Sequence, residues 1–497
     1  MIAVTSPLTG ELLSEVPIRS AEEVAAAVER ARGAFGTWSE AGIQGRGRVM
    51  KRVLDRMVAD RDRLIDELIV ETGKVRGDAL QEVVLFLDTF RFYLGNAATF
   101  LADEIVSPHI MKNKRGVITR RPRGVVGIIS PWNFPIDLGF GEAIPAMLAG
   151  NCVVLKPSEL TPLINLTIAE MASQAGLPGG VFQVVTGAGE TGAALCEEVD
   201  QITFTGSVGV GRIVAQVAAR RLIPCTLELG GKDPMIVLRD ADLDRAARAA
   251  VWGAFFNSGQ MCMSVERVYV EESVADTFID KVVSRTSRLR QGVDGHYTHD
   301  VGAMTRLQQI DLVEAHVADA IELGARVLTG GKRAPGLPES FYEPTVLVEV
   351  DHSMRIMREE TFGPVLPIMR VADVQEAIQL ANDTEFGLNA SVWSKDKGTA
   401  RSVARAIESG NVCVNDVVSS YAMLELPFGG EKTSGIGRRQ GPGGIRKYTV
   451  CQSVSEDRLG LGSEIHWYPY SARRLGAIEK ISGIFGGLKG LFGKGHE

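Results

Sequence analysis

The chain has 497 residues, a formal net charge of −7, 45% hydrophobic residues and 23% charged residues. This composition is that of an ordinary globular protein, long enough for two or three domains. Without a basic excess to neutralise phosphates, nucleic acid is not expected as a partner. The six scattered cysteines form no CxxC pair and no Cys/His cluster at zinc spacing. This argues against a disulfide framework and a bound metal, and it favours a reducing compartment.

Two segments bear on the location of the protein. Residues 1–17 lack the basic segment and the apolar core of a secretory signal. The longest apolar region, residues 124–155, is interrupted by three prolines and several polar residues, so it does not predict a membrane span. We therefore expect a cytoplasmic protein.

The first hundred residues show helical spacing of apolar side chains. Ser20, followed by early glutamates, predicts a capped helix over residues 20–35. Charged amphipathic segments predict two further helices, over residues 46–71 and 78–101. This part of the chain is expected to be mainly helical.

Strands and helices alternate from residue 124 onward. Short β-branched runs at 124–130 and 152–158 are typical of buried parallel strands, and the segment between them is compatible with a helix. The alternation continues through helices at 161–175, 189–197 and 209–220 and strands at 181–187, 201–207 and 224–231. It predicts an α/β fold with a mostly parallel sheet.

A second α/β series follows the first. Its expected strands cover residues 234–240, 265–271, 326–329, 344–350, 388–394 and 410–416, and its expected helices cover residues 242–255, 273–290, 305–323, 373–382 and 398–409. Two segments with polar–apolar alternation, 115–122 and 447–455, flank the two series. They predict an antiparallel pair of strands that forms an arm.

One cysteine, Cys262, lies in a segment that suits a reactive group. A free cysteine usually packs as a small buried side chain. Here, small or polar residues at 257–260 come just before the thiol, and the apolar alternation VERVYV follows it. This pattern indicates a loop that leads into a strand, a common place for functional residues. From these residues alone, both a packed thiol and a nucleophile remain open.

Two polar residues stand in apolar surroundings that catalytic groups often occupy. Asn133, in SPWNFP, follows a predicted buried strand. Its amide either satisfies a turn between two prolines or donates to a developing oxyanion. Glu228, in TLELGGK, lies in an apolar strand, where desolvation raises a carboxyl pKa as a general base requires. The alternative for Glu228 is a pair with a buried lysine or arginine.

Residues at the ends of other strands indicate a weaker cofactor signal. Lys156 and Glu159 follow a buried strand and suit ribose hydroxyls, while Gly206 and Ser207 open a helix and suit a phosphate. The glycine spacing of this helix start does not match the usual dinucleotide fingerprint.

Seven motifs together resemble the aldehyde dehydrogenase superfamily over about residues 5–455. They are PWNFP, VLKPSE, FTGS, LELGGK, NSGQMC, EETFGPV and PFGGEKTSGIGR, in the order and spacing of that family. The resemblance implies Cys262 as the nucleophile, Glu228 as the base and Asn133 as an oxyanion donor. It implies oxidation of an aldehyde to the acid with NAD(P)+ through a thiohemiacetal and a thioester. Because relatives that acylate coenzyme A lack the base, Glu228 favours hydrolysis of the thioester.

The resemblance also implies an architecture. It consists of a Rossmann-like cofactor domain, an α/β catalytic domain and a small antiparallel oligomerisation arm, which would assemble a homodimer or a tetramer. The corresponding ranges are 1–103 with 123–229 for the cofactor domain, 230–446 for the catalytic domain, 104–122 with 447–456 for the arm, and 457–497 for a C-terminal extension.

By resemblance, a set of residues would line the NAD(P) site. They are Trp132, Lys156, Ser158, Glu159, Gly206, Ser207, Gly230, Glu360 and Phe362. A carboxylate at Glu159 would bind ribose hydroxyls and repel a 2′-phosphate, so NAD is favoured over NADP. The alternative to an active enzyme is a structural or NAD-binding homologue that keeps the fold but has lost turnover. It loses weight because Cys262, Glu228, Asn133 and Lys156 are all present.

The expected substrate is a small apolar aldehyde, aliphatic or aromatic. Relatives that oxidise succinic semialdehyde commonly carry an arginine six residues before the nucleophile, where this chain has Phe256. Met261 and Met263 flank the thiol and are expected to line the substrate site with Phe256. A succinic-semialdehyde dehydrogenase is the alternative, since a loop elsewhere can supply a cation.

The C-terminal extension has the pattern of a basic amphipathic helix. Apolar residues recur at three- and four-residue spacing at Leu475, Ile478, Ile481, Phe485, Leu488 and Phe492, among several arginines and lysines. Seven glycines after residue 475 weaken this helix. Three alternatives remain open: packing on a neighbouring subunit or over the substrate entrance, peripheral membrane contact through residues 472–497, and a disordered appendage.

Overall fold

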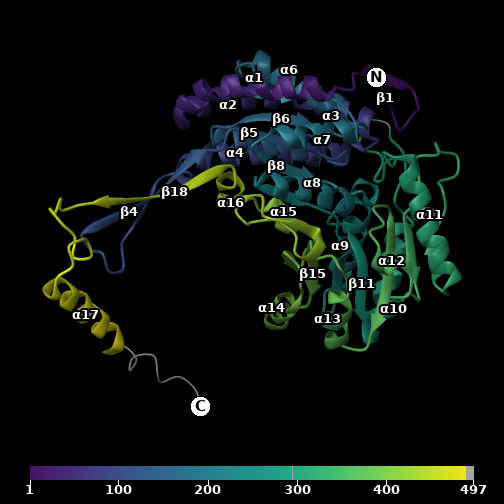
Figure 1. Ribbon diagram of the computed structural model, residues 1–497. Coiled ribbons are helices and arrows are strands. Elements are labelled where there is room, and N and C mark those ends of the chain that lie inside the picture. Colours follow the sequence, from purple (N-terminus) through teal and green to yellow (C-terminus); the bar gives the residue numbers. More distant parts are fainter. Residues whose placement is uncertain (294, 488–497) are drawn as a thin grey trace. The chain divides into compact units, whose positions relative to one another are not determined.

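The computed structural model describes residues 1–293 and 295–487. The chain forms two compact units (Figure 1). The larger unit contains residues 1–102 and 120–450, and the smaller one contains residues 103–119 and the described residues from 451 onward. The expected α/β fold, with parallel sheets and a small antiparallel sheet, is confirmed. The expected domain boundary at residue 230 stays a prediction.

Four helices follow a short N-terminal hairpin, β1 (Ile2–Thr5) and β2 (Leu12–Val16). They are α1 (Ala21–Glu40), α2 (Gly42–Ala59), α3 (Arg61–Thr72) and α4 (Arg76–Phe100). Ser20 and Glu23 form a capping box at the start of α1. The expectation of one helix over 46–71 is wrong, because Asp60 leaves the helical region with φ −101° and ψ 17°. Apolar spacing continues on both sides of this break, so the pattern conceals it.

The first sheet is six-stranded, in the order β17-β9-β8-β5-β6-β7. Its strands are β5 (Val125–Ile129), β6 (Cys152–Lys156), β7 (Phe182–Val184), β8 (Gln201–Thr205), β9 (Cys225–Glu228) and β17 (Gly435–Ile436). The helices between them are α5 (Glu142–Leu148), α6 (Leu163–Gln174), α7 (Gly189–Glu198) and α8 (Val208–Arg221). Strands β5 to β9 are parallel, whereas β17 is antiparallel to β9. The strand order reverses between β5 and β8, the point where open α/β sheets bind ligands.

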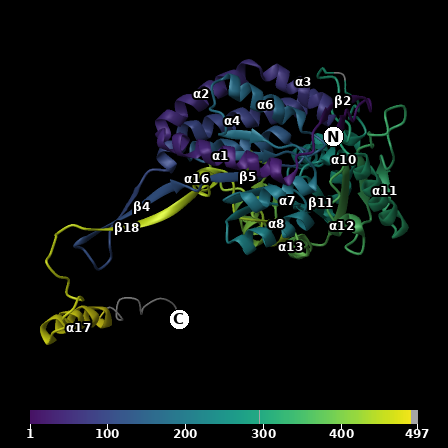
Figure 2. The same cartoon turned by 45° about the horizontal axis from the view of Figure 1, so that its top comes forward.

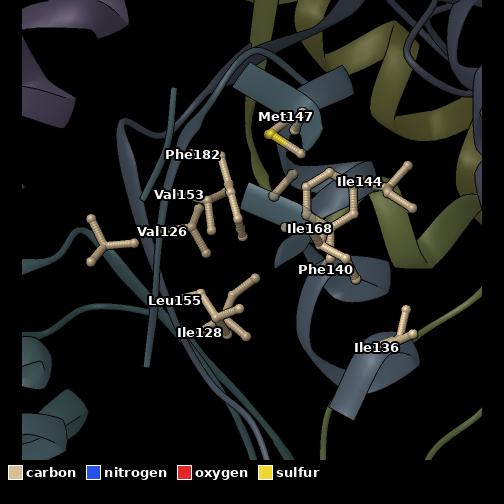
Figure 3. Close-up of a cluster of buried hydrophobic side chains, with 14 of the residues drawn as sticks. Val126, Ile128, Ile136, Phe140, Ile144, Met147, Val153, Leu155, Ile168 and Phe182 are labelled. Carbon is tan, nitrogen blue, oxygen red and sulfur yellow. The ribbon is translucent and has the colours of Figure 1, made fainter. Parts of the chain in front are cut away.

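The core of this sheet is built from apolar strand residues and from a helical segment that packs against them. Figure 3 shows Val126, Val153 and Leu155 of the strands opposite Phe140 and Ile144, all of them buried. Phe140 belongs to a π-helical turn, Asp137–Gly141, that precedes α5. The helix expected between β5 and β6 is therefore present, with a local widening at its start.

The second sheet is seven-stranded, in the order β12-β13-β14-β11-β10-β15-β16. Its strands are β10 (Asp233–Val237), β11 (Val265–Glu271), β12 (Arg326–Thr329), β13 (Thr345–Val348), β14 (Val365–Val371), β15 (Asn389–Trp393) and β16 (Asn411–Val414). Its helices include α9 (Leu243–Phe255), α10 (Glu272–Thr286), α11 (Leu307–Glu322), α13 (Val374–Asn382) and α14 (Lys397–Ala406). All its pairs are parallel except β12 with β13. Figures 1 and 2 both show α1 and α2 beside the first sheet and α10 and α11 beside the second.

The smaller unit is a three-stranded sheet followed by a helix. Strand β4 (Lys114–Pro122) lies between β18 (Thr449–Asp457) and β3 (Glu104–Val106), and β3 runs antiparallel to β4. The two arm strands expected from the sequence are confirmed to within two residues. Helix α17 (Ala472–Gly487) matches the start of the expected helical tail, whose remainder lies outside the described residues. Among the described helices, none has the length and apolar content needed to cross a bilayer.

Candidate active site

The backbone just before Cys262 adopts a strained turn. Asn257 and Ser258 have φ angles of 51° and 57°, in the left-handed region that non-glycine residues rarely occupy. Asp78 of α4 accepts a hydrogen bond from the Asn257 N–H at 2.9 Å. The Ser258 hydroxyl donates to the Gly302 carbonyl at 3.0 Å. These contacts from distant segments hold the turn and fix where Cys262 is presented, just ahead of β11.

Two glycines allow other backbone segments to approach this turn closely. A Cβ on Gly259 would lie 2.2 Å from the Gly363 carbonyl oxygen. A Cβ on Gly231 would lie 2.4 Å from the Cys262 carbonyl oxygen. Any other residue would force these backbones apart, which explains a glycine in both NSGQMC and LELGGK.

Asn133 is hydrogen-bonded to the turn that precedes Cys262. Its buried amide donates one hydrogen bond from Nδ2 to the Gln260 carbonyl at 2.9 Å. The Asn257 amide in turn donates to the Asn133 carbonyl at 3.2 Å. Because Nδ2 carries two hydrogens, one remains to donate into the site. The geometry therefore suits an oxyanion donor held at a fixed place beside the thiol.

Glu228 is the last residue of β9, and its side chain is buried. Neither of its carboxylate oxygens has a hydrogen-bond partner among the described residues. Burial raises the pKa of Glu228 to about 8, against the opposing charges of Arg439 and Lys447. A carboxyl group with this pKa exchanges protons near neutral pH, as a general base must. The alternative of a structural ion pair is not what the geometry shows.

The surroundings of the Cys262 thiol disfavour its ionised form. Burial raises its pKa, and the nearby carboxylates of Asp233, Glu360 and Glu228 raise it further, while Arg439 acts in the opposite direction. Since the thiolate is the nucleophile, attack on a carbonyl requires transfer of the thiol proton to an acceptor.

These three groups line one cavity at the switch point of the first sheet. Nine residues proposed from the sequence line it: Trp132, Asn133, Gly206, Ser207, Glu228, Gly230, Cys262, Glu360 and Phe362. The segments after β5, β8 and β9 meet there the turn before β11. The Trp132 and Phe362 rings are edge to face, with centroids 5.5 Å apart. The cavity therefore brings reactive groups and proposed cofactor residues together.

A buried ion pair holds the segment that carries Glu360 and Phe362. Glu266 pairs with Lys232 at 2.5 Å and accepts the N–H groups of Thr361 at 2.9 Å and Phe362 at 3.0 Å. Glu360 accepts the Gly231 N–H at 3.1 Å, and desolvation raises the pKa of Glu360 to about 8. Glu266 thus fixes the backbone of this segment in a position where Glu360 and Phe362 line the cavity.

A close approach on the same side explains a further glycine. A Cβ on Gly230 would lie 2.4 Å from a Glu360 carboxylate oxygen. The first glycine of LELGGK therefore leaves room for a cavity-lining acid.

Lys156, Ser158 and Glu159 lie outside this cavity lining. Lys156 ends β6, the strand beside β5, and its Nζ pairs with Glu159 at 3.3 Å. The Ser158 hydroxyl accepts the Leu160 N–H at 3.2 Å, a turn contact. Their cofactor-binding roles stay predictions.

The three proposed substrate residues gather in one apolar cluster. Phe256, Met261 and Met263 pack with Leu388, Tyr421 and Phe428, and Cys262 touches this cluster. The Phe134 and Phe256 rings are stacked, with centroids 6.0 Å apart. The surroundings of the thiol on this side are therefore apolar, although these side chains do not line the cavity described above.

The sequence reasoning missed a buried cation, Arg439. Its guanidinium lies 5.2 Å from the Tyr421 ring centroid and pairs with Glu142 at 3.1 Å. Asp137 lies 3.8 Å away. The doubled arginine after PFGGEKTSGIG was the available signal, but nothing in the local pattern tells which arginine is buried.

Arg306, Gln309 and Leu312 at the start of α11 also line the cavity and were missed. They belong to an ordinary amphipathic helix start, more than forty residues along the chain from Cys262. Only the tertiary fold brings them to the site.

A thiol, a carboxyl group with no hydrogen-bond partner among the described residues and an amide donor therefore line one cavity, an arrangement that suits covalent chemistry on a cysteine. The model of the aldehyde dehydrogenase family matches residues 1–454. The chain belongs to this family, whose members are NAD(P)-dependent oxidoreductases that act on aldehydes and are generally oligomeric.

Similar proteins cover nearly the whole chain. A Mycolicibacterium smegmatis protein named "Putative succinate-semialdehyde dehydrogenase (NADP+)" is 42% identical over 96% of this chain and 93% of its own length. A "4,4'-diapolycopene aldehyde oxidase" of Methylomonas sp. is 42% identical over 95% of this chain and 88% of its own. The crystal structure of a Mycobacterium tuberculosis aldehyde dehydrogenase complexed with NAD+ has a TM-score of 0.88 at 36% identity, over 93% of this chain and 95% of its own.

Proposed function

We propose that this enzyme oxidises its aldehyde through a covalent intermediate on Cys262. The observation that carries the proposal is the convergence of Cys262, Asn133 and Glu228 on one cavity. The Cys262 sulfur attacks the aldehyde carbon as its proton leaves to an acceptor, which gives a thiohemiacetal oxyanion. The free Nδ2 hydrogen of Asn133 donates to that oxyanion, a contact whose loss typically costs about 3 kcal/mol of barrier.

The residues of the cavity fit a nicotinamide cofactor. When bound, NAD(P)+ would supply the hydride acceptor, so that loss of a hydride from the thiohemiacetal carbon would leave a thioester on Cys262. Trp132, Phe362 and Glu360 would hold it within the cavity, and Gly206 with Ser207 offers the start of α8 to a phosphate.

Glu228 completes the cycle. Its ionised form takes a proton from water, the hydroxide attacks the thioester carbon, and the sulfur leaves as the thiol of Cys262 once it regains a proton. Both carboxylate oxygens lack a hydrogen-bond partner among the described residues, so they are available to accept this proton.

For the substrate, we propose an apolar aldehyde. The cluster of Phe256, Met261 and Met263 beside Cys262 supports it, and the name of the Methylomonas relative refers to a diapolycopene aldehyde. Succinic semialdehyde is the second candidate, because the M. smegmatis relative is named for it and Arg439 is a buried cation beside the cluster. The pairing of Arg439 with Glu142 weighs against that candidate, since its charge is already compensated.

A panel of aldehydes tests the proposed function. NADH formation is followed by absorbance with hexanal, benzaldehyde and succinic semialdehyde, and Cys262→Ser serves as the control. We expect hexanal and benzaldehyde to have the higher kcat/KM. A clear preference for succinic semialdehyde would overturn the apolar substrate. Turnover of no aldehyde would favour a homologue that has lost activity.

We further propose that NAD is preferred over NADP. Glu159 is partly exposed near the end of β6, where its carboxylate would bind ribose hydroxyls and repel a 2′-phosphate. Glu159→Gln should therefore raise kcat/KM for NADP+ relative to NAD+. An unchanged ratio would contradict this role.

Two further proposals concern assembly and location. The arm formed by β4 and β18 would join subunits into a dimer or a tetramer, because β18 is an edge strand of its sheet and exposed strand edges need covering. The protein would be cytoplasmic, and its C-terminal tail, residues 472–497, would contact the surface of a membrane. Residues 488–497 of this tail lie outside the described residues.

A further inference from the structure

Three buried charged side chains lie at the start of α4. Lys74 precedes this helix by two residues, and Asp78 and Glu82 stand about one helical turn apart within it. Their exposed fractions are 2%, 6% and 2%. None of the three is among the described residues that line the cavity. We call these three residues the α4 cluster; the mechanism proposed above does not use it.

The α4 cluster contacts the segment that carries the oxyanion donor. Glu82 pairs with Lys74 through one carboxylate oxygen and accepts the Ile136 N–H at 2.9 Å through the other. The Lys74 Nζ lies 4.1 Å from the centroid of the Phe134 ring, within the range of a cation–π contact. Phe134 and Ile136 follow Asn133 by one and three residues. Lys74 and Glu82 therefore hold the backbone segment that carries the Asn133 amide.

The same stretch of chain also contacts the turn that carries the nucleophile. Asp78 accepts the Asn257 N–H at 2.9 Å. Just before the α4 cluster, the Thr72 carbonyl accepts the Thr305 hydroxyl at 2.7 Å, and the Thr305 N–H donates to the Gln260 side chain at 2.8 Å. The oxyanion donor and the thiol are thus both held from the junction between α3 and α4.

Stability alone is a poor explanation for the pair of Lys74 with Glu82. Replacement of a buried ion pair by apolar side chains is often neutral or stabilising. The pair does, however, resist movement of its neighbours. A shift of the Asn133 segment would leave the Ile136 N–H and a Glu82 oxygen buried without a partner, which is costly. The contacts therefore restrict where the Asn133 segment can lie.

We propose that Lys74 and Glu82 are positioning residues, which set the place of the Asn133 amide relative to the Cys262 sulfur. This inference rests on the proposed function and deepens it, because it names the residues that place the oxyanion donor. Neither side chain lines the cavity, so both act through the Asn133 segment. Misplacement of a catalytic group by about 1 Å can lower a rate by about 10²-fold.

The double variant K74M/E82Q tests the proposal in the full-length enzyme. It removes both charges together, keeps side chains of similar size and leaves an amide oxygen that can accept the Ile136 N–H. We expect its urea unfolding curve to resemble that of the wild type. With hexanal, its KM should change little, and its kcat should fall by about 10²-fold.

The matched control is R32M/D200N. Arg32 pairs with Asp200 at 2.8 Å, and Asp200 also accepts the Val125 N–H at 2.8 Å. This half-buried pair lies at the amino ends of β5 and β8, whereas the cavity lies at their carboxyl ends. The control variant should keep the wild-type kcat.

A double-mutant cycle with Asn133→Ala separates positioning from a general structural role. Once the Asn133 amide is absent, its placement no longer matters, so K74M/E82Q should cause no further loss of kcat in that background. Alkylation of Cys262 by iodoacetamide, followed by peptide mass mapping, gives a second readout. Its rate should be unchanged in K74M/E82Q, because this displacement forms no oxyanion.

Three results would overturn the inference. They are a wild-type kcat in K74M/E82Q, equal losses of kcat with and without the Asn133 amide, and slowed alkylation of Cys262. If K74M/E82Q does not fold, Glu82→Asp replaces it in the cycle, since it keeps the charge but shortens the reach toward Ile136; a wild-type kcat there would also overturn the inference. A wild-type kcat in Asn133→Ala would instead contradict the proposed function itself.

Discussion

Glu228 and Glu266 are both buried, yet their surroundings differ completely. Glu266, at the start of β11, pairs with Lys232 and accepts two backbone N–H groups. Glu228, at the end of β9, has no hydrogen-bond partner among the described residues. The same side chain is therefore satisfied at one strand end and left unsatisfied at another within the same unit.

The difference indicates that Glu266 has a structural role and leaves Glu228 available for the proposed proton transfer. A satisfied buried carboxylate stabilises the folded chain and fixes its neighbours, here the segment with Glu360 and Phe362. An unpartnered carboxylate costs stability but keeps its proton exchangeable near neutral pH. The burial of Glu228 destabilises the folded state, and hydrogen-bonded ion pairs such as that of Glu266 with Lys232 offset this loss.

The largest effect is expected at the thiol. Cys262→Ser should lower kcat for the preferred aldehyde by at least about 10³-fold, because serine is a far weaker nucleophile than a thiolate. Its unfolding transition should match that of the wild type. The measurement is NADH formation beside a urea unfolding curve. Activity within tenfold of wild type would rule out Cys262 as the nucleophile.

Substitution of Glu266 should lower the stability of the fold, whereas substitution of Glu228 should not. Glu266→Gln leaves the buried Lys232 uncompensated and should lower the free energy of unfolding by about 3–5 kcal/mol. Glu228→Gln removes no hydrogen bond to any described residue and should not destabilise the fold. Urea unfolding of both variants at pH 7 compares them directly. Equal losses of stability would break the distinction between the two sites.

Asn133 tests the oxyanion contact. Asn133→Ala should lower kcat by about 10²–10³-fold, with a smaller change in KM, because the contact strengthens only as the oxyanion forms. Asn151→Ala is the control, since Asn151 is also buried, donates to the Ala146 and Tyr448 carbonyls and is not among the residues that line the cavity. A loss confined to KM would mean that Asn133 only binds substrate.

Arg439 should affect the pH dependence of the reaction through the pKa of Glu228. The rate limited by Glu228 requires its ionised form and should rise with pH through about 8. Because the charge of Arg439 lowers the pKa of Glu228, Arg439→Met should move this rise to higher pH, and Arg439→Lys should leave it in place. The measurement is the pH dependence of kcat. An unmoved profile in a folded Met variant would mean that Arg439 has only a structural role.

The sequence predicts what is local and misses what only tertiary contacts create. Cys262, Glu228 and Asn133 were recognisable because each sits in a short motif beside a strand, and the structure brings them to one cavity. Strand β14 was not expected, because Pro367 lies inside it and proline argues against a central strand. Asp78, which holds the nucleophile turn from α4, gave no signal at all.

The central claim is that Glu228 releases the acid from a Cys262 thioester. Stopped-flow mixing of Glu228→Gln with NAD+ and hexanal, followed by intact-mass measurement, tests it most directly. The account predicts a burst of NADH of up to one equivalent per site, little further turnover, and an acyl group trapped on the protein. Steady turnover at the wild-type rate with no acyl-enzyme would contradict it.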